Sequence, residues 1–452
     1  MPPISIPASF WRGGTSRGLL VRAEALAPFP HAIRDRILKT ALGTPDPAGR
    51  QIDGLGGGAS SLSKVAIVGP SGEATDHQKL NGILPGVGWA DRGTDRDGNP
   101  YDVVYRFGQV PIRNDDAIDW TASCGNLVAA VALASLTDHM IPYTTLFTRS
   151  RALKRRDRDA RGRGEDEPIQ FPISILSASN GVVVKARVPI DPVSLQVYEP
   201  DEPGRGCRIA GVPGQDEPGI EVELPLGSSG GRGGALVTGR AKDVVPMDDG
   251  HRVTVSIVTA GLPNVFVPVS SLARLVSLPE DIDVLTLSGS ELDSIPHLNS
   301  TLARIRTNAA LEFGLPLSLA SPKITLVGPV PRRGYTTSAG DVVGPDDADL
   351  LVRAVSSGDW HATIPGTTLG ALNVAAGTRG TVVDDLVREA GRATEQERVT
   401  VRAGHLAGVA ESTVRFSPSS STGIRTPESV VMMRTAREIM RGNVLIPERV
   451  FR

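Results

Sequence analysis

The sequence of 452 residues has only two cysteines, few aromatic residues and no long hydrophobic run. Cys124 and Cys207 cannot form the disulfide framework of a small secreted protein, and such scarcity is typical of a reducing compartment, so we expect a cytoplasmic location. No stretch reaches the roughly 18 uninterrupted apolar residues of a membrane-spanning helix. The first residues lack a basic region followed by an apolar run, so we also expect no secretory signal.

The sequence also lacks an excess of either charge, since 48 basic residues oppose 50 acidic ones. A long basic stripe is missing outside residues 149–167, which argues against nucleic acid as a partner. In 149–167 acidic residues interleave with basic ones and no apolar face is present, so we predict a mobile surface insertion. The seven histidines show no metal-ligand spacing, so we predict no metal site.

Glycine (50) and proline (35) are abundant, whereas aromatic residues make up only 4% of the chain, which favours a β-rich protein with many turns. Strand-like and helix-like segments alternate, so we predict two α+β halves, residues 1–190 and 191–424. Apolar residues in 429–440 predict a helix within a C-terminal segment, 425–452, that packs back on the first half.

The most informative position is Cys124, which stands with Gly125 and Asn126 directly before an apolar segment, residues 127–133. This pattern places a thiol at the N-terminus of a buried helix, where free N–H groups and the helix dipole favour negative charge. Such a site lowers the pKa of a thiol or binds an anion beside it. The alternative is an ordinary buried cysteine.

Two further loops of the first half carry polar groups. Residues 12–18 (Arg-Gly-Gly-Thr-Ser-Arg-Gly) combine glycines that admit an oxyanion with arginines that match a carboxylate, although a plain glycine turn would look the same. Residues 51–64 resemble a phosphate loop but fail its spacing. Lys64 ends that loop and begins an apolar strand, where it is either a desolvated amine available as a base or a lysine that reaches solvent.

The second half has a related pair of polar turns. Residues 321–323 (Ser-Pro-Lys) precede a strand. Thr367 and Thr368 precede an apolar segment, residues 369–376, and mark either a second helix N-terminus open to an anion or a hydroxyl cap on an ordinary helix.

Taken together, these motifs resemble the 2-methylaconitate cis–trans isomerase (PrpF-like) family, which includes aconitate Δ-isomerases, methylitaconate Δ-isomerase and 4-oxalomesaconate tautomerase. The matches run in order from residue 12 to residue 447. The resemblance implies a diaminopimelate-epimerase-like α+β fold, in which two pseudo-symmetric halves each wrap a mixed sheet around a central helix. It also implies an isomerase of small unsaturated di- or tricarboxylic acids that works by allylic proton abstraction and reprotonation, without a cofactor or metal.

The resemblance assigns the proton-transfer groups to Lys64 and Cys124. It implies a small-molecule carboxylate as the partner and leaves a homodimer open. The residues expected to bind the substrate are Thr15, Ser16, Arg17, Ser60, Ser61, Gly125, Asn126, Lys323, Gly366 and Thr367.

Two departures keep alternatives open. Epimerases of this fold use two facing cysteines, whereas Cys207 lies in a Gly/Arg loop without a helix behind it, so an amino-acid-type racemase or epimerase is the alternative enzyme. The family's Gly-His-Pro-Ser-Gly turn is Gly-His-Leu-Ala-Gly at residues 404–408, so the substrate need not be 2-methylaconitate. A non-catalytic carboxylate-binding protein is the alternative from outside enzymes.

Overall fold

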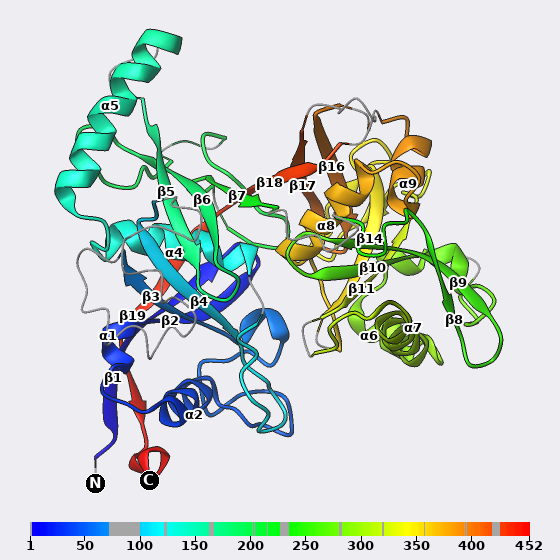
Figure 1. Cartoon of the computed structure of the whole chain (residues 1–452), viewed down its shortest axis with the longest axis horizontal. Coiled ribbons are helices and arrows are strands. Elements are labelled where there is room, and N and C mark those ends of the chain that lie inside the picture. The colour runs from blue at the N-terminus through cyan, green and yellow to red at the C-terminus, as the bar shows by residue number, and fades with distance from the viewer. Residues whose placement is uncertain are drawn as a thin grey trace. The chain divides into compact units, whose positions relative to one another are not determined.

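The computed structural model describes residues 2–71, 100–121, 124–161, 167–200, 202, 204–214, 216–226, 235–279, 283–318, 321–356, 358–392, 394, 396–417 and 425–452. The chain forms two compact units: unit 1 is residues 1–225 with 433–452, and unit 2 is residues 226–432. Figure 1 labels the elements of both. Unit 1 is longer than the predicted first half, residues 1–190, because β7 (Ile220–Pro225) pairs with β6 (Val182–Ile190) and extends the unit to residue 225.

Unit 1 is a mixed sheet with helices on both faces. Its remaining strands are β1 (Ile4–Gly13), β2 (Ser16–Arg22), β3 (Lys64–Pro70), β4 (Val103–Gln109), β5 (Ile169–Ser177) and β19 (Ala436–Ile446). Along the sheet β1 and β2 are antiparallel, β2 and β3 parallel, β3 and β4 antiparallel, β4 and β5 parallel, and β5, β6 and β7 antiparallel. β19 pairs with the other edge of β1.

The central helix of unit 1 is α4 (Gly125–Thr137), which is apolar all round and buried from Gly125 to Ser135. A helix without a polar face has to be enclosed on every side, and α4 packs against β1, β2, β6, β7 and β19. The other face of the sheet packs on α1 (Ala23–Leu26) and α2 (His31–Leu42) through a separate aliphatic cluster.

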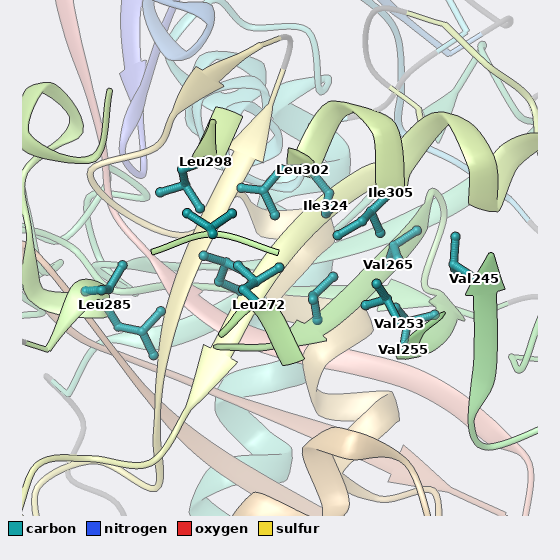
Figure 2. Packing of buried hydrophobic residues seen from close by; sticks show 14 of the residues in the cluster. Val245, Val253, Val255, Val265, Leu272, Leu285, Leu298, Leu302, Ile305 and Ile324 are labelled. Atoms are coloured by element: carbon teal, nitrogen blue, oxygen red, sulfur yellow. The ribbon is translucent and has the colours of Figure 1, made fainter. Parts of the chain in front are cut away.

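Unit 2 has a similar sheet. Its strands are β8 (Asp243–Pro246), β9 (Arg252–Thr259), β10 (Pro263–Pro268), β11 (Lys323–Gly328), β14 (Leu350–Ser356), β15 (Asp359–Trp360), β16 (Arg398–His405), β17 (Gly408–Phe416) and β18 (Pro427–Arg434), with a small hairpin of β12 (Tyr335–Thr336) and β13 (Val342–Val343). Helices α8 (Gly366–Ala376) and α9 (Val382–Glu389) pack on one face. Helices α6 (Gly289–Ser294) and α7 (Leu298–Phe313) cover the aliphatic side chains of the other, as Figure 2 shows for Leu298, Leu302 and Ile324.

The two units repeat one topology. In unit 2, β9 and β10 are antiparallel, β10 and β11 parallel, β11 and β14 antiparallel, β14 and β16 parallel, and β16 and β17 antiparallel, in the order seen in unit 1. The third strand of each series begins with a lysine: β3 and the following proline read Lys-Val-Ala-Ile-Val-Gly-Pro, and the β11 segment reads Lys-Ile-Thr-Leu-Val-Gly-Pro. α4 and α8 are therefore counterparts, as are Lys64 and Lys323.

The predicted C-terminal helix is wrong. Residues 427–434 and 436–446 form β18 and β19, and the segment is buried with a period of two, since Val430, Met432 and Arg434 are buried while Met433 is exposed. The apolar spacing fits both periods, and pairing with β17 and β1 supplies the backbone hydrogen bonds of a strand. In the predicted insertion, residues 149–161 belong to α5 (Tyr143–Arg161), and residues 162–166 lie outside the described residues.

Within the described ranges, no helix is both long and apolar enough to cross a membrane. The same ranges hold no group of three or more His, Cys, Asp or Glu side chains arranged to ligate a metal ion.

Candidate active site

The site of unit 1 is built around the start of α4. Cys124 is the N-cap residue, has an extended backbone and is 9% exposed. Its side chain accepts no capping hydrogen bond, so the first-turn N–H groups of Gly125 and Asn126 lack a side-chain acceptor on the helix. The helix therefore begins where the sequence predicted.

Residues 12–18 form the tight turn between β1 and β2, and this turn packs on the start of α4. Asn126 Nδ2 donates to Thr15 Oγ1 at 3.1 Å and to Ser16 Oγ at 3.5 Å. A Cβ atom at Gly13 would lie 2.5 Å from the carbonyl oxygen of Asn126, and Gly14 has φ +50° with Asn126 Oδ1 2.7 Å from such a Cβ. The glycines are required because the turn approaches the helix too closely for side chains. Four predicted residues, Thr15, Ser16, Gly125 and Asn126, therefore come together.

A buried arginine that sequence reasoning missed completes this cluster. Arg434 Nε donates to Asn126 Oδ1 at 2.8 Å and Nη1 to the Met433 carbonyl at 2.7 Å, while Nη2 has no hydrogen-bond partner among the described residues. Burial lowers the pKa of Arg434 to about 10, and the nearby thiols of Cys207 and Cys124 act in the opposite direction. In the sequence Arg434 opens an Arg-Thr-Ala-Arg segment, residues 434–437, but this segment falls within the predicted C-terminal helix, which gave Arg434 no place in the site.

Lys64 is the first residue of β3. The alternative interpretation, a lysine whose ammonium group reaches solvent, is wrong because the residue is buried. The residue is 8% exposed, Nζ donates to Gln109 Oε1 at 2.7 Å, and Nζ lies 5.3 Å from the centroid of the Phe107 ring. Desolvation lowers the pKa of Lys64, partly opposed by the negative charge of an ionised Cys124 thiol. The two predicted proton-transfer groups, Lys64 and Cys124, therefore lie within electrostatic range of each other.

Gln109, which sequence reasoning also missed, fixes the orientation of Lys64. Its Nε2 donates to the carbonyl oxygens of Ser60 and Ser63 at 3.0 and 2.9 Å, so its Oε1 faces the amine. A neutral amide at this place leaves the amine free of the carboxylate that would hold it protonated. The contribution of Ser60 to this arrangement comes from its backbone, and Ser61 lies with it in a short 3₁₀ turn, η1 (Ser60–Leu62).

The Arg17 side chain lies against Phe10 and Gly57 and not in the cluster at Asn126. Its guanidinium lies 5.8 Å from the Phe10 ring, and Gly57 is so close that a Cβ there would be 2.6 Å from Arg17 Nη2. Its Nε is buried without a hydrogen-bond partner among the described residues. Arg17 therefore lies beside the 51–64 loop.

Unit 2 contains a second polar cluster on the face of its sheet that α8 covers. Lys323 begins β11 and is 8% exposed, and its parallel neighbour in β10 is Asn264. Thr325 Oγ1 donates to Asn264 Oδ1 at 2.9 Å, so the amide Nδ2 of Asn264 points elsewhere and has no hydrogen-bond partner among the described residues. Sequence reasoning found Lys323 and missed Asn264.

Helix α8 begins at Gly366 after the N-cap Pro365, which contributes no side-chain hydrogen bond. Thr367 and Thr368 thus do not form the hydroxyl cap that was the alternative interpretation. The Oγ1 atom of Thr368 is buried and has no hydrogen-bond partner in the described part of the chain. The start of α8 and Asn264 therefore both present unpaired polar groups.

Cys207 lies in the irregular segment that precedes β7. Its backbone pairs with Glu217, and the Glu217 carboxylate binds the Arg12 guanidinium, which also donates to Thr435 Oγ1 at 3.0 Å. Burial raises the pKa of the Cys207 thiol, whereas the Arg434 guanidinium acts in the opposite direction. Both cysteines of the chain are free thiols within the electrostatic reach of Arg434.

Comparisons with known proteins agree over nearly the whole chain. The family described as "PrpF protein" matches residues 3–80 and 165–447. A 2-methyl-aconitate isomerase of Shewanella oneidensis is 30% identical over 99% of this chain and 98% of its own length. A 3-methylitaconate isomerase of Eubacterium barkeri is 26% identical over 98% and 97%. The crystal structure of methylitaconate-delta-isomerase matches with a TM-score of 0.65, at 25% identity, over 100% of this chain and 98% of that one. The predicted diaminopimelate-epimerase-like α+β fold is confirmed.

Proposed function

The chain belongs to the PrpF protein family, and from this premise we propose that it isomerises small unsaturated di- or tricarboxylic acids of the cis-aconitate or 2-methylaconitate type. The observation that carries this proposal is the buried Lys64 amine, whose pKa is lowered by desolvation and which interacts with Cys124 at the start of α4. The names of the relatives support the same reaction class, because they are isomerases of methyl-aconitate and methylitaconate.

The reaction begins at a methylene group between a carboxylate and a C=C bond. The neutral amine of Lys64 takes one of its protons, and the electron pair of the broken C–H bond spreads over the C=C bond and the carboxylate as a dienolate. The former double bond gains single-bond character and can rotate. Return of the proton to the same carbon gives cis–trans isomerisation, whereas delivery to the other end of the allyl system, with the Cys124 thiol as donor, shifts the double bond.

The groups around Asn126 hold the carboxylate on which the negative charge develops. The N–H groups at the start of α4 and the positive end of its dipole favour an anion. Nη2 of Arg434 adds a charged donor, and the hydroxyls of Thr15 and Ser16 add neutral ones. Donors already fixed by the fold stabilise the dienolate without having to reorganise during the reaction.

The test is isomerisation of a panel of aconitate-like acids in D₂O. We expect the purified protein to turn over at least one of cis-aconitate, 2-methylaconitate and methylitaconate, with deuterium appearing at the allylic carbon. Cys124→Ser should retain exchange of the first proton and lose the double-bond shift. Binding of these acids without any deuterium incorporation would instead identify a carboxylate-binding protein, and exchange of an amino-acid α-proton would identify an epimerase.

Within unit 2, Lys323, Asn264 and the start of α8 form a second cluster that we assign to carboxylate binding. Asn264→Asp tests this assignment, because it keeps the acceptor for Thr325 and replaces the unpaired amide nitrogen with an anionic oxygen. We expect KM to rise roughly 10–100-fold through repulsion of the substrate. Asn308→Asp is the control: it makes the same change at a half-buried residue of α7, whose amide donates to the Pro246 carbonyl, and should leave KM unchanged.

Thr368→Val separates ligand binding from folding at the same place. Because Oγ1 of Thr368 has no partner among the described residues, the isosteric change should leave Tm unchanged or raise it, while KM increases. A fall in Tm together with an unchanged KM would contradict the assignment.

A further inference from the structure

The outer face of unit 2, under α7, contains a buried arginine with no counter-charge. Arg353 of β14 is 1% exposed, and its Nε, Nη1 and Nη2 atoms are all buried without a hydrogen-bond partner among the described residues. Desolvation lowers its pKa to about 10, and no neighbouring charge opposes that effect. Leaving a guanidinium buried and unpaired is among the most costly arrangements a protein core can contain.

Arg353 lies on the face of the sheet that carries the aliphatic cluster under α7. Its partner across the sheet is Leu326, and this face of β11 is covered by α7 and its leucines (Figure 2). The guanidinium carbon of Arg353 lies 6.0 Å from the centroid of the Trp360 ring, and Trp360 Nε1 donates to Asn299 Oδ1 at 2.9 Å.

Asn299 lies in the first turn of α7, a helix of 16 residues whose N-cap, His297, makes no side-chain capping hydrogen bond. The uncapped N-terminal turn of a long helix carries partial positive charge. This charge lies at the turn that contains Asn299, the residue that binds Trp360.

Unit 1 has the same arrangement with one decisive difference. Arg106 of β4 lies opposite Ile67, the residue of β3 that corresponds to Leu326, and its guanidinium carbon lies 4.3 Å from the centroid of the Trp120 ring. Trp120 Nε1 donates to Asp35 Oδ2 of α2 at 3.4 Å, and the Asp35 carboxylate raises the pKa of Arg106 against the effect of burial.

Both units therefore place a sheet arginine over a tryptophan that binds a residue of the outer helix. In unit 1 that residue is a carboxylate, Asp35, and in unit 2 it is an amide, Asn299. The distance from guanidinium carbon to ring centroid is also longer in unit 2. In unit 2 the carboxylate at this place, Asp293, binds Asn299 Nδ2 and not the tryptophan, and no charged partner among the described residues acts on Arg353.

We propose that unit 2 binds a small planar oxyanion, of the carboxylate or nitrate class, between Arg353 and the first turn of α7, where unit 1 uses its own Asp35. A planar oxyanion matches the guanidinium fork with two parallel hydrogen bonds. This site is separate from the candidate active site, because Arg353 points to the face of the sheet opposite α8 and shares that face with Leu326 and Leu351.

The test uses formate as the probe and a double variant in which Asn299 and Asp293 exchange their side chains. Asn299 Nδ2 donates to Asp293 Oδ1 at 2.7 Å, so the double variant Asn299→Asp with Asp293→Asn keeps this hydrogen-bonded pair and the net charge while moving the carboxylate to Trp360 and Arg353. Thermal unfolding of the full chain is followed in gluconate buffer, with formate replacing gluconate at constant ionic strength.

We expect formate to raise the Tm of the wild-type chain by roughly 2–6 °C over a hundred-fold range of concentration. The double variant should have the higher Tm in gluconate and lose most of the formate effect, and Arg353→Met should lose it as well. Formate bound at the candidate active site raises Tm equally in all three proteins, so the difference between them measures the Arg353 site. An equal formate effect in the wild type and the double variant, or none in the wild type, would overturn the proposal.

Discussion

Replacing Lys64 by methionine is expected to lower kcat by about 10²–10⁴-fold, the usual contribution of a general base. The methionine fills a similar volume but has no amine to take the allylic proton. In the proposed mechanism the substrate carboxylate still binds at Asn126 and Arg434, so KM should change far less than kcat. The measurement is steady-state isomerisation by ultraviolet absorbance, together with deuterium incorporation.

Lys64→Arg is the matched control for charge. A guanidinium keeps the positive charge but does not lose its proton at any pH of the assay, so it cannot act as the base. If the positive charge alone were sufficient, Lys64→Arg would retain activity, and the assignment of Lys64 as the base would be wrong.

The lowered pKa of Lys64 also affects stability. The Lys64 side chain has its ordinary pKa of 10.5 in the unfolded chain and a lower pKa in the folded chain. At a pH between the two pKa values, the unfolded state therefore binds more protons than the folded state. The free energy of unfolding therefore rises with pH through this window, and the penalty for burying the ammonium is fully present only below the folded-state pKa. The wild type should gain stability relative to Lys64→Met as pH rises toward 10.5, as measured by denaturant unfolding.

The sequence predicts those site residues that a local pattern marks, and misses those whose role depends on residues far away in the sequence. Cys124 and Lys64 were found because each stands at a boundary between a polar loop and an apolar segment, which is local information. Gln109 and Asn264 were missed because their roles come from strand register, which brings Gln109 opposite Lys64 and Asn264 beside Lys323. No local pattern distinguishes such residues from other polar residues of a strand.

Arg434 shows how an error in secondary structure hides a site residue. The apolar spacing at the C-terminus fits a helix and a strand equally, and the choice is made by β1 and β17, which offer free edges. As a helix, the segment would place residue 434 on an arbitrary face. As β18, it buries that residue against Asn126, 308 positions away in the sequence.

Replacing Arg434 by methionine is expected to lower kcat/KM by roughly 10²–10³-fold, the usual cost of removing one partner of a buried charge contact. Because Lys64 has to be neutral to act as the proposed base, the positive charge near Cys124 would then come from Arg434. Loss of its Nη2 donor leaves a substrate carboxylate with uncharged partners only. Arg437→Met, an exposed change three residues along the chain, is the control and should leave kcat/KM unaltered.

A purely structural role for Arg434 would also lower activity, because its Nε holds Asn126 in place. The two roles differ in their dependence on substrate charge. If the guanidinium binds a carboxylate, Arg434→Met should act strongly on the free acid and only weakly on the half-ester that lacks that carboxylate, so the variant discriminates less between the two than the wild type does. If it only positions Asn126, both substrates should lose activity by the same factor, and that result would remove Arg434 from substrate binding.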